Sequence, residues 1–203
     1  MIWGIDDSNI CRNFKKIDYL LAEILDIKKL QTTKINLKEE EISGLIVDAT
    51  EQETEKRDWS WYSGKKKKHT IKTQTVSDGK WKIKHISKTV PWNIHDKKLF
   101  DNTKLKIDKN LNTLHSSMKN LKIIWDLWYI GTKCNVPFKK KRNKQLTIAE
   151  KEHNKSFSKR RIIIEHTFAH LKKFNILKDK FRNSIKNYNK IFAIIACLYN
   201  LKF

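Results

Sequence analysis

Three acidic residues stand where their side chains can meet around metal ions. Asp48 follows the apolar run 45–47 (LIV), Asp126 follows the run 121–125 (LKIIW), and Glu165 lies inside the segment 160–174 (RRIIIEHTFAHLKKF). Acids at the ends of neighbouring strands converge readily with a third acid from a helix packed alongside. Carboxylate oxygens are the ligands that Mg²⁺ prefers. Two such ions, roughly 3.5–4 Å apart, stabilise the attacking and leaving oxygens of a phosphodiester together. The spacing therefore indicates metal-dependent phosphoryl transfer.

Each acid also has an ordinary structural explanation. Asp48 and Asp126 fit strand-terminal turns, and Glu165 lies one helical turn after Arg161, where an ion pair forms easily. Three isoleucines precede Glu165, so we expect its side chain to be at least partly buried, where an unpaired carboxylate is costly. It is the combination of the three acids that favours the metal site. His166 and His170 share one helix face, but with no third ligand in evidence we interpret them as surface histidines.

The elements that must position these acids follow from the apolar pattern. Residues 45–47 predict a strand and 51–58 a charged loop. Residues 69–77 and 81–90 alternate as strands of a hairpin, with the turn at 77–80. Residues 94–102 predict a helix, 121–125 a second buried strand, and 136–141 a further short strand. From residue 146 the chain is predicted to be mostly helical, ending in a helix over 185–201. This order predicts an α/β domain whose first strands form a meander.

The first 30 residues predict an amphipathic helical piece. Apolar residues recur at steps of 4, 3, 4 and 3, which makes one face of a helix, and they are Ile10, Phe14, Ile17, Leu21 and Ile24. The opposite face carries Asn9 and Arg12, which suits a recognition helix and equally suits any surface helix. Residues 31–43 are polar and predict a linker. The catalytic domain is expected over 44–203.

The charge balance points to a polyanionic partner. The chain has 44 Lys+Arg against 22 Asp+Glu, a net charge of +22 over 203 residues. Such a field favours nucleic acid, contacted mainly through its phosphates. The apolar runs fall far short of the ~20 residues of a membrane span, and the start of the chain does not resemble a secretory signal. Three dispersed cysteines predict neither a disulfide framework nor a zinc site, which fits a reducing cytoplasm.

Several stretches resemble one known family. They are 45–52 (LIVDATEQ), 62–74 (YSGKKKKHTIKTQ), 95–100 (HDKKLF), 137–174 and the closing RN…I…IIACLYN. Together they resemble the DDE superfamily endonucleases, the transposases of bacterial insertion sequences. The resemblance implies a ribonuclease-H-like mixed sheet flanked by helices. The head of the chain resembles the recognition-helix end of a helix-turn-helix module, so a helical remnant of that module is expected over 1–30.

The resemblance also implies a function and its residues. Asp48, Asp126 and Glu165 become the metal ligands and catalytic residues, with two Mg²⁺ or Mn²⁺ ions as cofactors. The expected activity is cleavage and strand transfer at insertion-sequence ends. The expected partners are double-stranded DNA (element ends and target) and a second copy of the chain in a synaptic homodimer, in a bacterial cytoplasm at the nucleoid. Basic and polar residues expected to contact DNA are Asn9, Arg12, Lys65, Lys66, Lys67, Lys68, His69, Lys139, Lys140, Lys141, Arg142, Arg160 and Arg161. Solvated basic turns are the alternative interpretation of the lysine runs.

The chain departs from the family pattern near the second acid. A pattern like A-D-S-G-Y-Q-G reads here WDLWYIG over 125–131, with Trp128 in place of glycine and Ile130 in place of glutamine. Trp92 and Cys197 also stand where glycine is expected, and the chain has only 5 Gly, although glycine serves positive φ and close backbone approach. With the short head, this predicts an N-terminally truncated, degenerate copy with impaired transposition. The alternative is a non-catalytic basic DNA-binding relic, and Trp128 packing harmlessly on a helix is a third possibility.

Overall fold

A mixed sheet with helices on both faces forms the centre of the molecule. The structure is a computed structural model that describes residues 7–32, 34–36, 44–55, 59–78, 80–103, 106–108, 122–124, 137–138, 140 and 145–203. Strands β3 (Tyr62–Ser63), β4 (Lys68–Asp78), β2 (Gly44–Glu53) and β8 (Lys122–Ile124) lie side by side in that order. Strands β5 (Ile83–Ile86) and β6 (Val90–Pro91) also pair with β4. The α/β class predicted from the sequence is confirmed.

The long strand β2 has a different kind of neighbour on each side. It runs antiparallel to β4, with Asp48 opposite Thr75, and parallel to β8, with Ile46 opposite Ile124. A separate parallel pair joins β1 (Lys34–Asn36) to β7 (Lys106–Asp108). Strand β1 therefore lies within the segment predicted as a linker.

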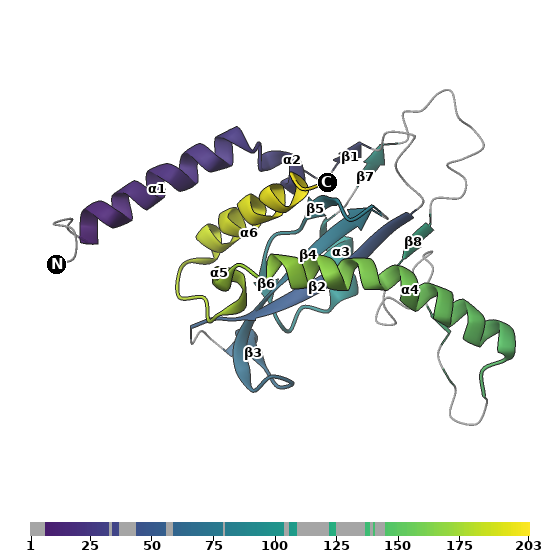
Figure 1. The fold of residues 1–203 in the computed structure, drawn as a ribbon. Helices are drawn as coiled ribbons and strands as arrows, with labels where there is room; N and C mark the ends of the chain where they lie inside the picture. Colours follow the sequence, from purple (N-terminus) through teal and green to yellow (C-terminus); the bar gives the residue numbers. More distant parts are fainter. Residues whose placement is uncertain are drawn as a thin grey trace.

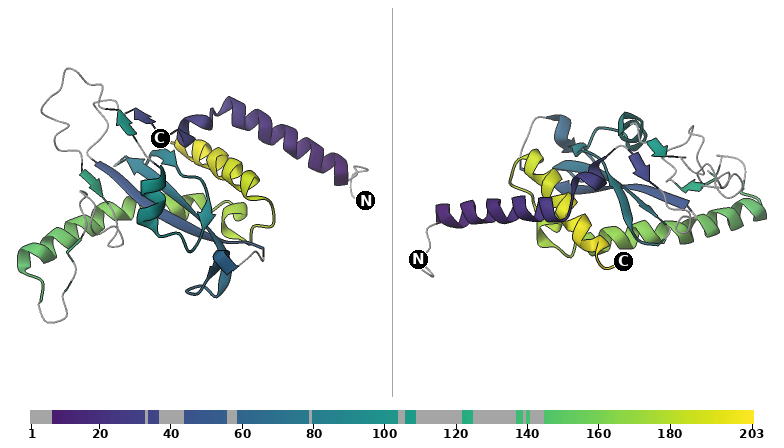
Figure 2. Two further views of the ribbon diagram at one scale, coloured as in Figure 1. Left: turned by 180° about the vertical axis from the view of Figure 1, so that it is seen from behind. Right: turned by 90° about the horizontal axis from the view of Figure 1, so that it is seen from above.

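Helices α4 (Ile148–Leu171) and α6 (Ile185–Asn200) cover one face of the sheet, and α3 (Asp96–Thr103) covers the other (Figures 1 and 2). Thr147 and Glu150 form a reciprocal capping box at the start of α4, and Ser184 caps α6. Two short helices are also present. Helix α5 (Asn175–Lys178) lies between α4 and α6 in the chain, and η1 (Trp59–Trp61) directly precedes β3. These cap side chains accept hydrogen bonds from backbone N–H groups of the first turn, which have no partner within the helix. The caps thereby fix where the two long helices begin.

The hydrophobic core lies between the sheet and the α4–α6 face. Ile46 and Ile71 from the sheet meet Ile164 from α4, and Tyr188 and Phe192 from α6, all of them buried. The polar stretch of β4 is buried as well, and Thr73 and Thr89 share a hydrogen bond of 2.8 Å there. The core therefore fixes the position of α4 on β2, which positions the candidate site.

Most predicted elements are confirmed, with three corrections. The hairpin at 77–80, the helix near 94–102 (α3), the strand near 121–125 (β8) and the C-terminal helices are all present. The strand predicted over 81–90 is divided into β5 and β6, with no strand over 87–89. Strand β2, however, continues to Glu53, so Asp48 lies mid-strand and the predicted loop over 51–58 was wrong for 51–53. Pairing with β4 explains this length, because all nine residues from Leu45 to Glu53 have partners. The described residues 137, 138 and 140 form no strand.

The predicted N-terminal helix is present as α1 (Asp7–Ile24), and much of its apolar face is exposed. Phe14, Ile17 and Ile24 are exposed, and Leu21 packs against the core from the side. The helix extends away from the sheet, with only its C-terminal end near α6 (Figure 1). Its helical class matches the prediction, whereas its role as a helix-turn-helix remnant stays a prediction. Among the described residues, no helix is long and apolar enough to span a membrane.

A buried histidine fastens the segment after α2 (Lys28–Gln31) to β5. The Nδ1 atom of His85 lies 2.8 Å from the Thr32 carbonyl oxygen, so Nδ1 donates the hydrogen bond. Within the described part of the chain, His85 Nε2 is buried with no hydrogen-bond partner. Burial lowers the pKa of His85, and the Thr32 hydrogen bond offsets this only in part.

The His85 environment makes folding stability depend on pH. Because the folded-state pKa is lowered, the unfolded state binds more protons as the pH falls below the ordinary value of 6.5. We expect the urea concentration at the midpoint of unfolding to decrease as the pH is lowered from 6.5 to 5. We expect His85→Asn, whose amide can replace Nδ1 but cannot titrate, to show a flatter profile. Identical pH profiles for the two proteins would contradict this assignment.

Candidate active site

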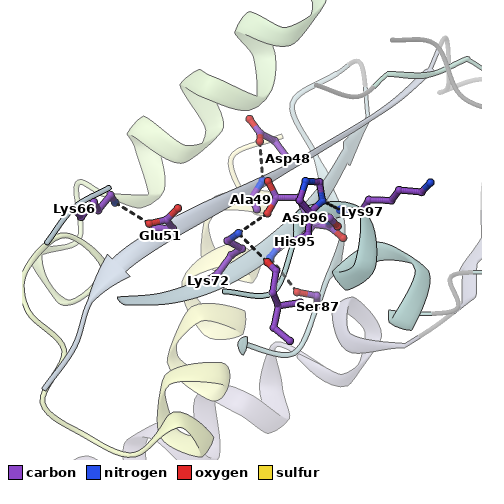
Figure 3. A network of polar contacts seen from close by, with 11 residues as sticks. Asp48, Ala49, Glu51, Lys66, Lys72, Ser87, His95, Asp96 and Lys97 are labelled. Carbon is purple, nitrogen blue, oxygen red and sulfur yellow. Dashed lines mark hydrogen bonds and ion pairs between the residues drawn. The ribbon is translucent and has the colours of Figure 1, made fainter. Parts of the chain in front are cut away.

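Asp48 and Glu165 are joined through one guanidinium group. Arg161 Nη2 lies 3.2 Å from Asp48 Oδ2 and 3.8 Å from Glu165 Oε1. Asp48 comes from the middle of β2 and Glu165 from α4, one turn after Arg161. The Asp48 and Arg161 side chains are only 19% and 20% exposed, so this is a mostly desolvated contact. The backbone N–H of Ala49 also donates to Asp48 Oδ1, at 2.8 Å (Figure 3).

This geometry fits a site for hard divalent cations. The two carboxylate oxygens are at most about 7 Å apart, because both lie against the same nitrogen, a span that two ions roughly 3.5–4 Å apart can bridge. Oxygen-only donors match Mg²⁺ and Mn²⁺. In the present structure the single positive charge of Arg161 lies between the two carboxylates, which leaves a net charge of −1 on the three side chains. No cluster of three or more His, Cys, Asp or Glu is found among the residues that the structure describes.

The third acid, Asp126, lies outside the described residues, as do Trp128 and Ile130. The strand before it is described. Ile124 on β8 pairs in parallel with Ile46 on β2, and Asp126 and Asp48 each follow two residues later in the sequence. Strand β8 is thus in parallel register with the part of β2 that precedes Asp48.

The prediction that Glu165 is partly buried was wrong. Its side chain is 56% exposed, whereas the adjacent Ile164 is fully buried. Neighbouring residues on a helix point about 100° apart, so the isoleucine faces the core and the glutamate faces the solvent beside Asp48. The ion pair with Arg161 that sequence reasoning left open is present.

The His95-Asp96 motif lies on the opposite face of the sheet. The buried Lys72 on β4 contacts Asp96 Oδ1 at 2.7 Å and donates to the Ile94 carbonyl oxygen at 3.0 Å (Figure 3). Asp96 begins α3, where its charge also complements the helix dipole. This explains the motif as a structural anchor for α3.

A basic groove continues from β2 toward the β3–β4 hairpin. It has a volume of about 430 Å³ and is lined by Glu51, Gln52, Glu53, Lys66, Lys68, Thr70, Lys172, Leu177 and Lys178. Lys66 and Lys68 pair with Glu51 and Glu53 at 3.6 and 2.6 Å. Burial, and next the positive charge of Lys66, lower the pKa of Lys172, while Glu51 raises it. With four lysines against two glutamates in its lining, the groove carries a net positive charge. Sequence reasoning missed Lys172 and Lys178.

The predicted DNA-contacting residues are distributed over several elements. Lys65, Lys66, Lys67 and Lys68 are exposed at the hairpin turn, and His69 is half-buried. Arg12 on α1, Arg160 on α4 and Lys140 are exposed, and Arg161 contacts Asp48. The side chain of Asn9, and Lys139, Lys141 and Arg142, lie outside what is described. Two histidines of α4 lie beside aromatic rings. The ring centroids of His166 and Trp81 are 5.6 Å apart, and those of His170 and Tyr199 are 6.1 Å apart.

Two of the substitutions for glycine cause no backbone strain. The described non-glycine residues with positive φ are Asp26, Lys67 and Trp81, so Trp92 and Cys197 occupy ordinary backbone conformations. Cys197 is a buried residue of α6, where its burial raises the pKa of the thiol to about 11. These two positions give no structural support to the predicted impairment.

Comparisons with known proteins identify the family of this chain. A family model described as a DDE superfamily endonuclease matches residues 47–200, a range that contains all three candidate acids. The chain is also 32% identical, over 207 aligned residues, to the probable transposase for insertion sequence element IS702 of Microchaete diplosiphon. That alignment covers 98% of this chain and 71% of the relative. No solved structure matches the chain significantly. The chain therefore belongs to the DDE superfamily of endonucleases, among its transposases.

Proposed function

We propose that this protein cleaves DNA at the ends of an insertion sequence and joins the freed end to target DNA, with Asp48, Asp126 and Glu165 as its catalytic acids. The observation that carries the proposal is the convergence of Asp48 and Glu165 on Arg161, from elements far apart in the sequence. The parallel register of β2 and β8 supports Asp126 as the third member. When bound, a pair of Mg²⁺ or Mn²⁺ ions supplies charge stabilisation for both oxygens of the displaced phosphodiester.

The chain's own residues then have distinct tasks. Asp48 is held by the Ala49 amide and by Arg161, so its carboxylate is oriented before any cation arrives. Glu165 lies at the solvent-exposed rim, where the substrate approaches. Arg161 keeps the acids together without cations and is positioned to contact a phosphate once they are bound. The exposed lysines of the hairpin would bind the flanking phosphates of double-stranded DNA.

The wider assignments belong to the same proposal. Residues 44–203 form the catalytic domain, and residues 1–30 contain the recognition-helix end of a DNA-binding head, joined through 31–43. A synaptic homodimer, acting at the nucleoid in a bacterial cytoplasm, would hold the two element ends. Because Trp128 and Ile130, in place of the family's glycine and glutamine, follow Asp126 closely in the sequence, we propose that transposition by this copy is impaired.

Nicking of a supercoiled plasmid tests this function. We expect purified protein to nick the plasmid with Mn²⁺ and, more slowly, with Mg²⁺, and to be inactive with EDTA. A non-catalytic DNA-binding relic is the alternative, which the net charge of +22 favours on its own. Retarded plasmid mobility at low salt with no nicking under any metal condition would establish that alternative.

A further inference from the structure

We propose that Trp59 stacks on an unpaired base of the bound DNA, and that the β3–β4 hairpin beside it holds the adjacent phosphates. The inference rests on the proposed DNA-cleaving function and names a feature of the substrate: a duplex with one base out of the stack. Four features of the described residues support it.

The first feature is the exposure of the Trp59 indole. Trp59 is 82% exposed, whereas Trp61 of the same short helix η1 packs against the core. Trp61 therefore fastens the segment, and Trp59 projects into solvent. An exposed aromatic side chain on a protein with a net charge of +22 matches the stacking surfaces with which proteins bind unpaired bases.

The second feature is a row of rings that supports the indole. The Trp59 and Tyr62 ring centroids are 5.4 Å apart with planes at 71°, and the Tyr62 and His69 rings repeat this geometry at 5.5 Å and 71°. Tyr62 and His69 are cross-strand partners of β3 and β4. An edge-to-face contact occupies at most one face of the indole, so within the described part of the chain the other face is open to a base.

The third feature is a turn of lysines in which one residue, Lys67, has an unfavourable backbone conformation. Lys65, Lys66 and Lys67 are exposed at the tip of the hairpin, and Lys67 adopts a φ of 52°. Glycine adopts this conformation without a steric penalty. A lysine here is therefore better explained by its charge than by the requirements of the turn.

The fourth feature is the distance from the candidate acids. Lys68 pairs with Glu53 at the end of β2 at 2.6 Å, five residues beyond Asp48, which corresponds to about 17 Å along a strand. The hairpin lies at the end of the sheet away from β8 (Figure 1). Since B-DNA rises about 3.4 Å per base pair, a duplex lying along β2 would extend about five base pairs from Asp48 to the hairpin.

The binding experiment uses two synthetic duplexes of the same sequence, one fully paired and one with a single bulged 2-aminopurine. We expect the full chain to bind the bulged duplex about 10-fold more tightly, the effect of one stacked base, and to quench the 2-aminopurine fluorescence. We expect Trp59→Ala to lose the preference and the quenching while retaining its affinity for the paired duplex. Phe203→Ala, a change at an exposed ring at the C-terminus, should behave like the parent protein.

A second variant separates stacking from charge. We expect Lys67→Gly to fold at least as stably as the parent protein, to bind both duplexes more weakly with a lower salt dependence, and to retain the bulge preference. Equal affinity of the parent protein for the two duplexes, or an unchanged preference in Trp59→Ala, would overturn the proposal. These readouts need no metal, so Asp48→Asn should retain the preference, and a failed nicking assay would not affect the result.

Discussion

Replacing Asp48 with asparagine is expected to lower metal-dependent plasmid nicking at least about 100-fold, since loss of a charged cation ligand costs several kcal/mol in the transition state. Asp48 is the best-defined acid of the site, with an N–H donor on one oxygen and Arg161 on the other. Asparagine has nearly the same shape but lacks the negative charge. Affinity for DNA should be unchanged or higher, because a charge that repels phosphate is removed. Agarose gels quantify the nicking, and fluorescence anisotropy at several salt concentrations measures the binding.

The matched control for Asp48→Asn is Glu53→Gln on the same strand. Glu53 pairs with the exposed Lys68, away from Arg161, so its loss should leave the nicking rate within about twofold, as for other exposed ion pairs of small energetic value. Full activity of Asp48→Asn would contradict the assignment of Asp48. An equal loss of activity in Asp48→Asn and Glu53→Gln would also contradict it, because removal of any negative charge from β2 would then have the same effect.

The largest expected effect on stability is that of Ile164→Ala, at about 2–5 kcal/mol. Ile164 is fully buried between α4 and the sheet, and its truncation leaves a cavity in the contact that places Glu165 beside Asp48. A domain of this kind has a total free energy of unfolding of about 5–15 kcal/mol, so the variant loses a large fraction of it. Circular dichroism during urea unfolding measures the change.

Ile162→Ala is the matched control for Ile164→Ala. Ile162 is on the same helix but 44% exposed, and its truncation should cost within about 0.5 kcal/mol, as is usual at surface positions. Comparable losses at the two positions would show that α4 does not pack on the sheet through Ile164.

The sequence predicts this architecture where one local signal dominates. Thr147 and Glu150 have the residue types and spacing of a capping box, which by itself marks the start of α4. The hairpin turn near residues 77–80 is predicted from its Asp-Gly pair and the alternation on both sides. The candidate acids Asp48 and Glu165 are also accessible to sequence reasoning, since each follows an apolar segment that must be buried.

The features that sequence reasoning missed depend on tertiary partners. The sequence around Glu51 and Glu53 is polar and therefore predicts a loop. In the structure it is a strand because it pairs with β4. The exposure of Glu165 depends on the rotation of α4 against the sheet, which periodicity does not determine when Ile162, Ile163 and Ile164 stand in a row. Only Ile164 of the three is fully buried. Likewise, the link between Arg161 and Asp48 joins residues 113 positions apart.

Cleavage of the polypeptide by bound Fe²⁺ is the most direct test of whether the three acids share one site. Fe²⁺ occupies oxygen-donor sites of this kind, and with ascorbate and peroxide it generates hydroxyl radicals that cut the nearby backbone. We predict cuts close to residues 48, 126 and 165 in the same protein, detected by mass spectrometry. All three should disappear together in Asp48→Asn or on addition of excess Mg²⁺. Cuts at only one of these positions, or cuts near 126 and 165 that persist in Asp48→Asn, would contradict the shared metal site.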